Sequence, residues 1–426
     1  APMNKTVISC QVNDLSEAPK AALFDFANEE TVHDVHNFHR SLPGYRPTPL
    51  VRLSGLAGYL GINQLSIKDE SFRFDLKAFK VLGASYAMAK CLGEVIGLGD
   101  DALTCNNIIA HKSAYDHLTF VTATDGNHGR AVAWAANLFG CKSVVYMPEG
   151  SSPVRLEAIR KFGAKASVTG LNFDDSVMYA SQQAQENGWI LLQDTSWEGY
   201  EKVPRHIMQG YATLITESMG QGQEKKLPTH VFVQAGVGSF AAAIIASLIS
   251  LAGGAAPKFI VVEPEGAPCL FESIKKGRRV RIKGDLATIM AGLSCGEPSR
   301  MGWKILKSAA SAFLMCSDAV ARRGMKVLGN PLEGDQRIIS GESGAVTLGA
   351  LFEIMSDKDN RKIRKAIGLD SGSRVLLFST EGDTDPDVYR DIVWALKTDE
   401  RQEENNRPSG RHELGKHIQA EKTIRY

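Results

Sequence analysis

Short apolar runs recur along the chain and alternate with segments of helical periodicity. The runs are rich in Val, Ile, Leu and Phe and lie at 65–70, 118–124, 142–148, 165–170, 189–195, 229–236, 258–264 and 373–380. Between them, segments such as 127–139 and 154–162 carry the apolar pattern of an amphipathic helix. Apolar strands that alternate with amphipathic helices are typical of parallel sheets covered on both faces. The pattern therefore predicts an α/β protein.

The apolar runs fall into two groups, which predicts two domains. We expect a small, mobile domain at 100–193 and a large, discontinuous domain made of 1–99 and 194–397. Each should contain a mostly parallel sheet flanked by helices. Ligands of such sheets bind at the carboxyl ends of the strands, so we expect the active site in the cleft between the domains. Residues 398–426 are highly charged and poor in apolar side chains, which predicts a tail or a peripheral helix.

The uncharged stretch 231–257 is long enough to resemble a membrane span. Its first part is rich in β-branched residues and is then interrupted by glycines, so strand, loop and buried helix is the better interpretation. The first twenty residues contain no apolar run of signal-peptide length. We therefore expect a cytoplasmic protein that does not bind a membrane.

Composition argues against several kinds of site. The 49 Lys and Arg residues nearly balance the 48 Asp and Glu residues, so nucleic acid is not an expected partner. The seven cysteines are odd in number and scattered, which favours buried thiols, although Cys269 with Cys295 stays open as a pair. His33, His36 and His39 recur every third residue. This spacing favours a packed or solvated helix over a metal site. We expect no metal.

A glycine loop follows the run at 229–236. Gly236, Gly238 and Ser239 stand between a predicted strand and a predicted helix, where free backbone amides can hold a phosphate. With Ala241 the loop also matches the dinucleotide pattern G-x-G-x-x-A, and Glu263 ends the next strand at about the position of a ribose-binding acid. An NAD-dependent oxidoreductase is therefore an alternative from a different class of enzyme.

Lys80 has apolar neighbours on both sides, namely Phe79 and Val81. Desolvation lowers the pKa of an ammonium group and makes the amine available for a Schiff base. Lys77 follows polar residues in the sequence and is the weaker candidate for this chemistry.

Five motifs occur along the chain in a characteristic order: AFKVLGA, DGNHG, AGVGS, GESGA and FSTEGDTD. This order resembles the fold-type II pyridoxal phosphate enzymes, which include the serine and threonine dehydratases and the tryptophan synthase β chain. The resemblance covers roughly 45–394. Within the group, the runs GYRPTPL, TDGNHGRAVAWAA and RIISGESGAV make the chain most similar to the diaminopropionate ammonia-lyases. The resemblance implies the two-domain fold of the group, pyridoxal 5'-phosphate as cofactor and a homodimer.

The resemblance also implies roles for individual residues. Lys80 should bind the cofactor covalently and later handle the Cα proton, and Asn127 should hydrogen-bond the 3-hydroxyl group. The pyridine nitrogen should meet a hydroxyl, either Ser379 or Thr380, and Glu342 should lie near the ring. The phosphate should be bound by backbone amides of Gly236, Val237, Gly238 and Ser239.

The implied reaction is α,β-elimination of 2,3-diaminopropionate, through an aminoacrylate, to pyruvate and two ammonia. A dehydratase acting on serine or threonine is the alternative within the same fold, and a non-catalytic ligand sensor is a third class. The chain departs from the dehydratase pattern at Ala78, where a serine is usual, and at Asp125, where a small hydroxyl residue is usual.

We expect Asp125 and Asp194 to face the substrate, because a carboxylate near Cβ can hold a departing ammonium group. Members of the family process both enantiomers, which requires a base on each face of Cα. Lys80 would serve one face and Asp125 the other. The plainer alternatives are a turn-forming role for Asp125 and a helix-capping role for Asp194.

Overall fold

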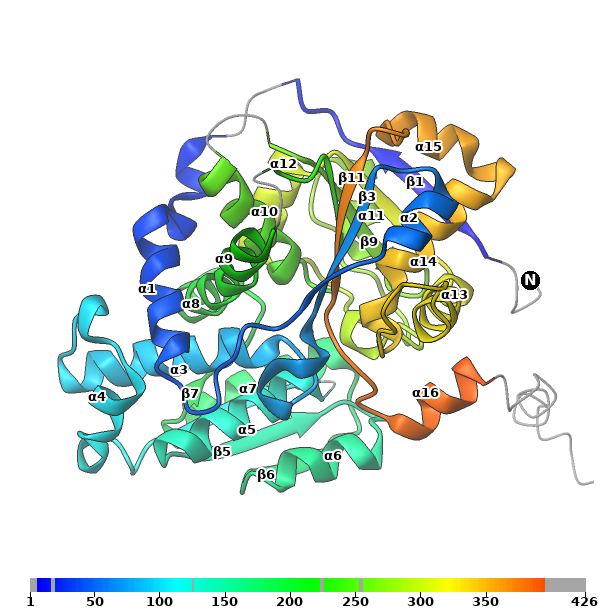
Figure 1. Ribbon diagram of the computed structural model, residues 1–426. Coiled ribbons are helices and arrows are strands. Elements are labelled where there is room, and N and C mark those ends of the chain that lie inside the picture. The colour runs from blue at the N-terminus through cyan, green and yellow to red at the C-terminus, as the bar shows by residue number, and fades with distance from the viewer. Residues whose placement is uncertain (1–5, 17–19, 125, 223–225, 253–255, 395–426) are drawn as a thin grey trace, which may run out of the picture.

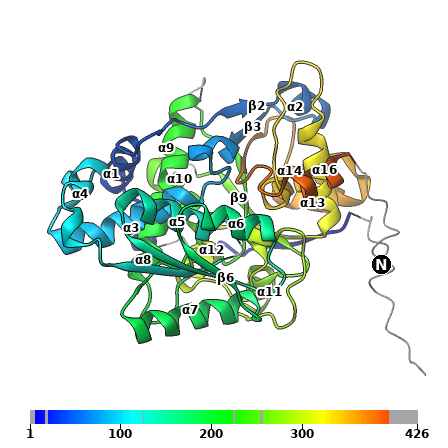
Figure 2. The same ribbon diagram turned by 90° about the horizontal axis from the view of Figure 1, so that it is seen from below.

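The computed structural model describes residues 6–16, 20–124, 126–222, 226–252 and 256–394 of the chain. The described residues form one seven-stranded and one four-stranded sheet, each flanked by helices (Figures 1 and 2). The fold is therefore α/β, as the sequence predicts.

The larger sheet has a parallel centre and antiparallel edges. Its five central strands run parallel, while the first and last strands pair antiparallel with their neighbours. In spatial order, the strands are β1 (Ile8–Val12), β10 (Ala312–Cys316), β9 (Lys258–Pro264), β8 (His230–Gln234), β11 (Arg374–Ser379), β3 (Gln64–Asp69) and β2 (Leu50–Arg52).

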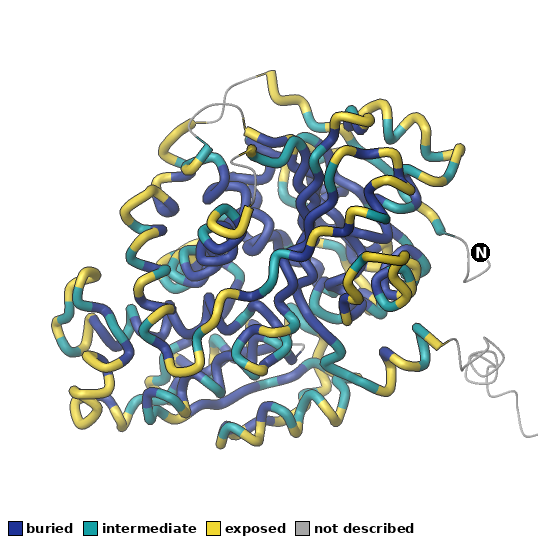
Figure 3. The backbone as a smooth tube through the Cα atoms, viewed as in Figure 1, coloured by how far each residue is buried: buried dark blue, intermediate teal, exposed yellow. Residues whose placement is uncertain are grey.

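Alternate side chains of the central strands pack into two separate cores. In β8, Val231 and Val233 contact one core and Phe232 contacts the other, because successive side chains of a strand point to opposite faces. This explains why these strands have no alternating polar positions: both faces are covered. The strands are correspondingly buried along their length (Figure 3).

Two sets of helices supply the rest of these cores (Figure 1). On one face lie α1 (Glu29–Arg40), α3 (Lys80–Ile96), α8 (Lys202–Gly210), α9 (Ala212–Gln221), α10 (Ser239–Ala252), α11 (Cys269–Lys276) and α12 (Arg300–Ala309). On the other face lie α2 (Ser54–Leu60), α13 (Asp318–Gly329), α14 (Glu342–Ser356), α15 (Arg361–Ile367) and α16 (Pro386–Val393).

The smaller sheet is entirely parallel. Its strands, in spatial order, are β6 (Lys165–Val168), β5 (Lys142–Met147), β4 (Thr119–Ala123) and β7 (Ile190–Leu191). Figure 2 shows α5 (Asn127–Phe139) and α6 (Pro153–Arg160) on one face and α7 (Phe173–Asn187) on the other. The short α4 (Cys105–Ile109) precedes this sheet in the chain. The sheet is thus built from the predicted small-domain segment, while the exact domain boundaries stay a prediction.

Most predicted elements are confirmed. Each predicted apolar run contains a strand, and the helix predicted at 127–139 is α5. The stretch 231–257 contains β8, a loop and α10, and none of the described helices is long and apolar enough to cross a membrane. The pattern missed β1, β2 and β10. The predicted tail at 398–426 lies outside the described residues.

Candidate active site

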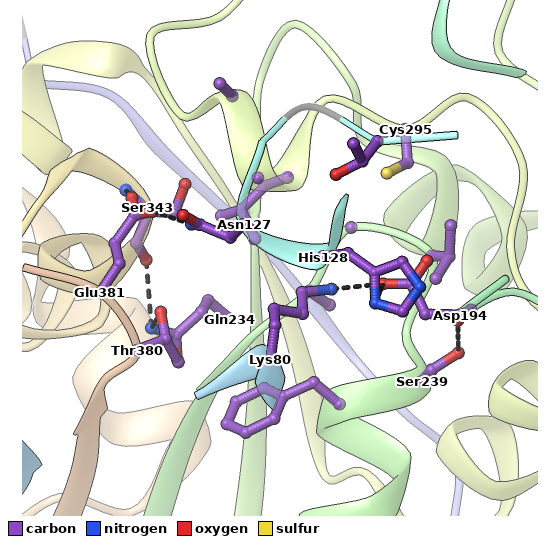
Figure 4. Close-up of a pocket in the computed structure, with 18 of the residues that line it drawn as sticks. Lys80, Asn127, His128, Asp194, Gln234, Ser239, Cys295, Ser343, Thr380 and Glu381 are labelled. Carbon is purple, nitrogen blue, oxygen red and sulfur yellow. Dashed lines mark hydrogen bonds and ion pairs between the residues drawn. The ribbon is translucent and has the colours of Figure 1, made fainter. Parts of the chain in front are cut away.

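A pocket lies where the two sheets face each other, at the carboxyl ends of β4, β8 and β11 (Figure 4). Thr124 and Asn127 reach it from the smaller sheet, and Gln234 and Thr380 reach it from the larger one. Lys80 enters from the first turn of α3. The carboxyl ends of parallel strands are the usual place for a ligand in such folds.

The backbone before Lys80 is held in an unusual conformation. Phe74, Asp75 and Lys77 have φ angles of 48°, 57° and 54°, a left-handed region that side chains other than glycine rarely adopt. Hydrogen bonds from Phe79 N to Thr380 O and from Gly382 N to Lys77 O tie this segment to the end of β11. Strained backbone persists where the surrounding structure holds it, and here it positions Lys80 in the pocket.

Lys80 is ion-paired with Asp194. Lys80 Nζ lies 2.5 Å from Asp194 Oδ2, and Nδ1 of His128 lies 3.9 Å from the same oxygen. Burial alone would raise the pKa of Asp194, but the charge of Lys80 and then that of His128 outweigh it and lower the pKa to about 2. Ser239 Oγ donates to the backbone oxygen of Asp194 at 2.7 Å, which fixes the residue against the glycine loop. Asp194 is therefore an anion at neutral pH, suited to hold an ammonium group.

The glycine loop has the form of an anion cradle. The backbone amides of 236–239 donate to no other described residue, and they stand at the start of the 14-residue helix α10, whose dipole favours an anion. A Cβ atom at Gly236 would lie 2.8 Å from Cys295 Sγ, and Gly238 has a φ of 93°. Glycine is thus required at both positions, and the loop fits a phosphate group.

Thr380 faces the pocket, whereas Ser379 is turned away from it. Gln234 Nε2 donates to Thr380 Oγ1 at 3.0 Å, and the Thr380 hydroxyl donates to no described residue. Its hydrogen is thus available to a ring nitrogen. Ser379 Oγ instead donates to Ser340 Oγ at 2.8 Å. The geometry favours Thr380 of the two predicted hydroxyls.

Asn127 begins α5 and contacts a carboxylate from the other sheet. Its Nδ2 donates to Glu381 Oε2 at 2.5 Å, and the second oxygen of Glu381 accepts from Ser343 N at 3.0 Å (Figure 4). Glu342 does not line this pocket but an adjoining one. Burial first, and the Glu381 carboxylate second, raise the pKa of Glu342 to about 7.

The pocket brings together most of the residues predicted for the site: Lys80, Asn127, Asp194, Gly236, Val237, Gly238, Ser239 and Thr380. Asp125 lies outside the described residues. The sequence did not single out Gln234, Ser343 and Glu381, which also line the pocket. Gln234 and Glu381 stand at or just beyond the carboxyl ends of β8 and β11, and that position was an available signal.

Glu263 does not have the environment of a ribose-binding acid. Its two carboxylate oxygens accept hydrogen bonds from Leu270 N and Phe271 N at 2.8 and 2.6 Å, at the start of α11. The residue is fully buried and does not line the pocket. The interpretation of Glu263 as a ribose ligand is therefore wrong.

The cysteine and histidine candidates have structural surroundings. Cys269 and Cys295 are both thiols beside Gly236, and Cys269 Sγ lies 3.5 Å from Gly236 O. His39 is buried in α1 between Thr213 Oγ1 and Leu82 O, at 2.7 and 2.9 Å, and His36 contacts the Tyr45 hydroxyl. The packed helix is thus confirmed for His36 and His39.

Comparison with known proteins agrees with this geometry. The profile of the family described as pyridoxal-phosphate dependent enzyme matches residues 41–380. The chain belongs to the pyridoxal-phosphate dependent enzymes. Diaminopropionate ammonia-lyase of Escherichia coli (strain K12) is 48% identical over 362 residues, which cover 84% of this chain and 90% of that protein. Diaminopropionate ammonia-lyase of Salmonella typhimurium is 46% identical over 380 residues, covering 88% and 94%. Within the class, the chain belongs to the diaminopropionate ammonia-lyase family.

Solved structures of the same family have the same fold. A crystal structure of diaminopropionate ammonia lyase from Escherichia coli, in complex with an aminoacrylate-PLP azomethine reaction intermediate, has a TM-score of 0.84 at 43% identity. It covers 93% of this chain and 99% of that one. The complex of the Escherichia coli enzyme with D-serine has a TM-score of 0.86 at 43% identity, with the same coverage.

Proposed function

We propose that the protein is a pyridoxal-phosphate-dependent lyase that converts 2,3-diaminopropionate to pyruvate and two ammonia. The observation that carries this proposal is the Asp194 carboxylate, which already holds one ammonium group, that of Lys80, at 2.5 Å. A substrate with a second amino group gains from such a carboxylate, because a charge-assisted hydrogen bond is about twice as strong as a neutral one. A serine hydroxyl gains much less. The similarity to diaminopropionate ammonia-lyases supports the same choice.

The pocket residues fit the cofactor group by group. Lys80 would hold pyridoxal phosphate covalently, the amides of 236–239 would hold its phosphate, and the Thr380 hydroxyl would face its ring nitrogen. Asn127 would hydrogen-bond the 3-hydroxyl group. When bound, the cofactor withdraws electrons from the substrate Cα and so makes the Cα proton acidic.

The chain's own residues would then move protons and hold charge. Lys80 Nζ would accept the Cα proton on one face of the substrate. Asp194 would hold the 3-ammonium group, which keeps the leaving nitrogen protonated, and a protonated amine departs more easily than an amide ion. The burial of Asp194, which is 5% exposed, strengthens this charge pairing.

Asp125 completes the proposal as a hypothesis from the sequence. It directly precedes the turn that leads to Asn127, and a carboxylate there would supply a base on the face of Cα opposite to Lys80. Such a pair of bases would allow both enantiomers to react.

The resemblance further supports a homodimer, with a small domain at 100–193 that closes on a large one made of 1–99 and 194–397. Light scattering on the purified protein tests the dimer directly: a mass near twice 46.2 kDa supports it, and a single-chain mass refutes it.

The activity is tested by product stoichiometry. The protein, loaded with pyridoxal phosphate, is incubated with D- and L-2,3-diaminopropionate and, in parallel, with D- and L-serine and L-threonine. Two ammonia per pyruvate, with diaminopropionate strongly preferred, supports the proposal. One ammonia per ketoacid with serine or threonine preferred would instead establish a dehydratase.

A further inference from the structure

A second cavity adjoins the active-site pocket. Phe173, at the start of α7, and Ala291 line both cavities. We call this second cavity the outer chamber. It lies between the loop after β5, the segment 285–294 and the start of α14, and it is more open than the pocket itself. The outer chamber and the active-site pocket therefore share part of their lining.

The outer chamber is acidic. Among the described residues that line it are four carboxylates and one guanidinium: Glu149, Asp285, Glu342, Asp385 and Arg155. Glu149 and Asp285 are exposed at its rim. Asp385 is already engaged, because it accepts the Ser152 hydroxyl at 2.9 Å and caps α16. A cleft in which one sign of charge predominates raises the local concentration of ligands of opposite charge.

Glu342 is the carboxylate in the chamber that most needs a partner. It is only 7% exposed, yet among the described residues its carboxylate forms no ion pair and accepts a hydrogen bond only from its own backbone amide. The charged groups that face it are Glu381, Arg155 and Asp385, of which two are themselves acidic. A buried carboxylate that forms no ion pair is costly, so a cation that enters the chamber is stabilised there.

We propose that the outer chamber binds the incoming diamino acid, and that Glu342 holds its side-chain ammonium group before the substrate enters the active site. This inference rests on the proposed function. A diamino acid with both amines protonated carries a net positive charge, whereas serine and threonine are neutral zwitterions. The chamber therefore selects the substrate by charge before any chemistry occurs.

An ammonium group fits the chamber better than a metal ion does. Calcium requires six to eight oxygen ligands, and magnesium requires a near-ideal octahedron. The described residues contain no group of three or more His, Cys, Asp or Glu side chains that could hold a metal ion. A single buried carboxylate can, by contrast, pair with one ammonium group.

Glu342→Gln tests the proposal, with Glu333→Gln as the matched control, because Glu333 is exposed and does not line the chamber. We expect the KM for 2,3-diaminopropionate to rise about tenfold in Glu342→Gln, the size of one lost hydrogen bond to a charged group, with little change in kcat. The inhibition constant of D-serine, which has no second ammonium group, should stay within twofold. Glu333→Gln should match the wild type.

An unchanged KM, or equal weakening of both ligands, would overturn the inference. Wild-type protein that releases no pyruvate from diaminopropionate would instead refute the proposed function, so the two failures are distinct.

The salt dependence of kcat/KM gives a second test, which does not require the substitution of a buried residue. The kcat/KM of the wild type for diaminopropionate should fall as ionic strength rises, because added salt screens the rim charges. Asp285→Asn, at the exposed rim, should weaken this dependence, while D-serine inhibition should depend little on salt. A salt-independent kcat/KM in the wild type would overturn the inference even if Glu342→Gln failed to fold.

Discussion

Lys80 and Asp194 are 114 positions apart in the chain, and their side chains meet at 2.5 Å in the active-site pocket. The lysine comes from the first turn of α3, and the aspartate follows β7 of the smaller sheet. The pair thus joins a helix packed on the larger sheet to the end of a strand in the smaller one. It places an amine and an anion beside the site expected to hold the substrate's Cα and Cβ atoms.

The glycine loop predicts a loss of cofactor binding in Gly236→Ala. The new methyl group would lie 2.8 Å from Cys295 Sγ and 3.2 Å from Gly292 O, so the loop must shift away from the phosphate. We expect the dissociation constant of pyridoxal phosphate, measured by absorbance titration, to rise about tenfold or more. Gly220→Ala is the control, because no atom lies within 4 Å of its Cβ. Equal affinities in the two variants would contradict the assigned cradle.

The two neighbouring hydroxyls of β11 should respond differently to substitution. Thr380→Val keeps the shape but removes the hydroxyl, so we expect a shifted visible spectrum of the bound cofactor and weaker binding. Ser379→Ala removes the hydrogen bonds to Ser340 Oγ and to Glu381 O, at a cost of about 1 kcal/mol of stability, and should leave the spectrum unchanged. A spectral change in Ser379→Ala alone would reverse the assignment.

The buried Glu263 predicts a pH dependence of stability. Burial raises its pKa from 4.5 to about 8 in the folded state, although hydrogen bonds from Leu270 and Phe271 oppose the shift. A raised pKa means that the folded protein keeps a proton that the unfolded chain has already released. The contribution of Glu263 is therefore fully present below about pH 4.5 and is lost as the pH rises through 8.

Glu263→Gln removes this titration. We expect the Tm of the wild type to fall more steeply between pH 5 and pH 8 than the Tm of the variant, measured calorimetrically in the same buffers. Parallel curves would show that Glu263 is ionised throughout this range in the folded protein.

Asp125 is predicted to act on one enantiomer only. Asp125→Asn should retain pyridoxal phosphate and should reduce kcat much more for one of D- and L-2,3-diaminopropionate than for the other. The reason is that Lys80 still serves the opposite face of Cα. Steady-state rates with each pure enantiomer provide the measurement. Equal losses with both would exclude the two-base hypothesis.

The sequence revealed most elements whose burial is continuous, although it missed the largely buried β10. The central strands β8, β9 and β11 are covered on both faces, so their apolar runs are unmistakable, and the glycines after β8 mark the anion loop. The edge strands β1 and β2 were missed because they are short and only partly buried. Their pairing with β10 and β3 is a tertiary contact that local pattern does not encode.

The sequence predicted the residues of the candidate site less completely, again because some of them depend on tertiary contacts. Lys80 and the glycine loop have local signals, whereas Gln234 and Glu381 gain their roles from contacts across the pocket with Thr380 and Asn127. Those contacts join segments more than 140 positions apart. Ser379 contacts Ser340 and Thr380 contacts Gln234, and these tertiary contacts decide which hydroxyl faces the pocket. The sequence shows only that the two hydroxyl residues are adjacent.

Asp194→Asn shows whether a carboxylate beside Lys80 selects an ammonium group on the substrate. The measurement is kcat/KM for 2,3-diaminopropionate together with the inhibition constant of D-serine, with cofactor loading checked by absorbance. We expect kcat/KM to fall on the order of a hundredfold, while the D-serine inhibition constant stays within about twofold. An unchanged kcat/KM, or an equal loss for both ligands, would contradict it.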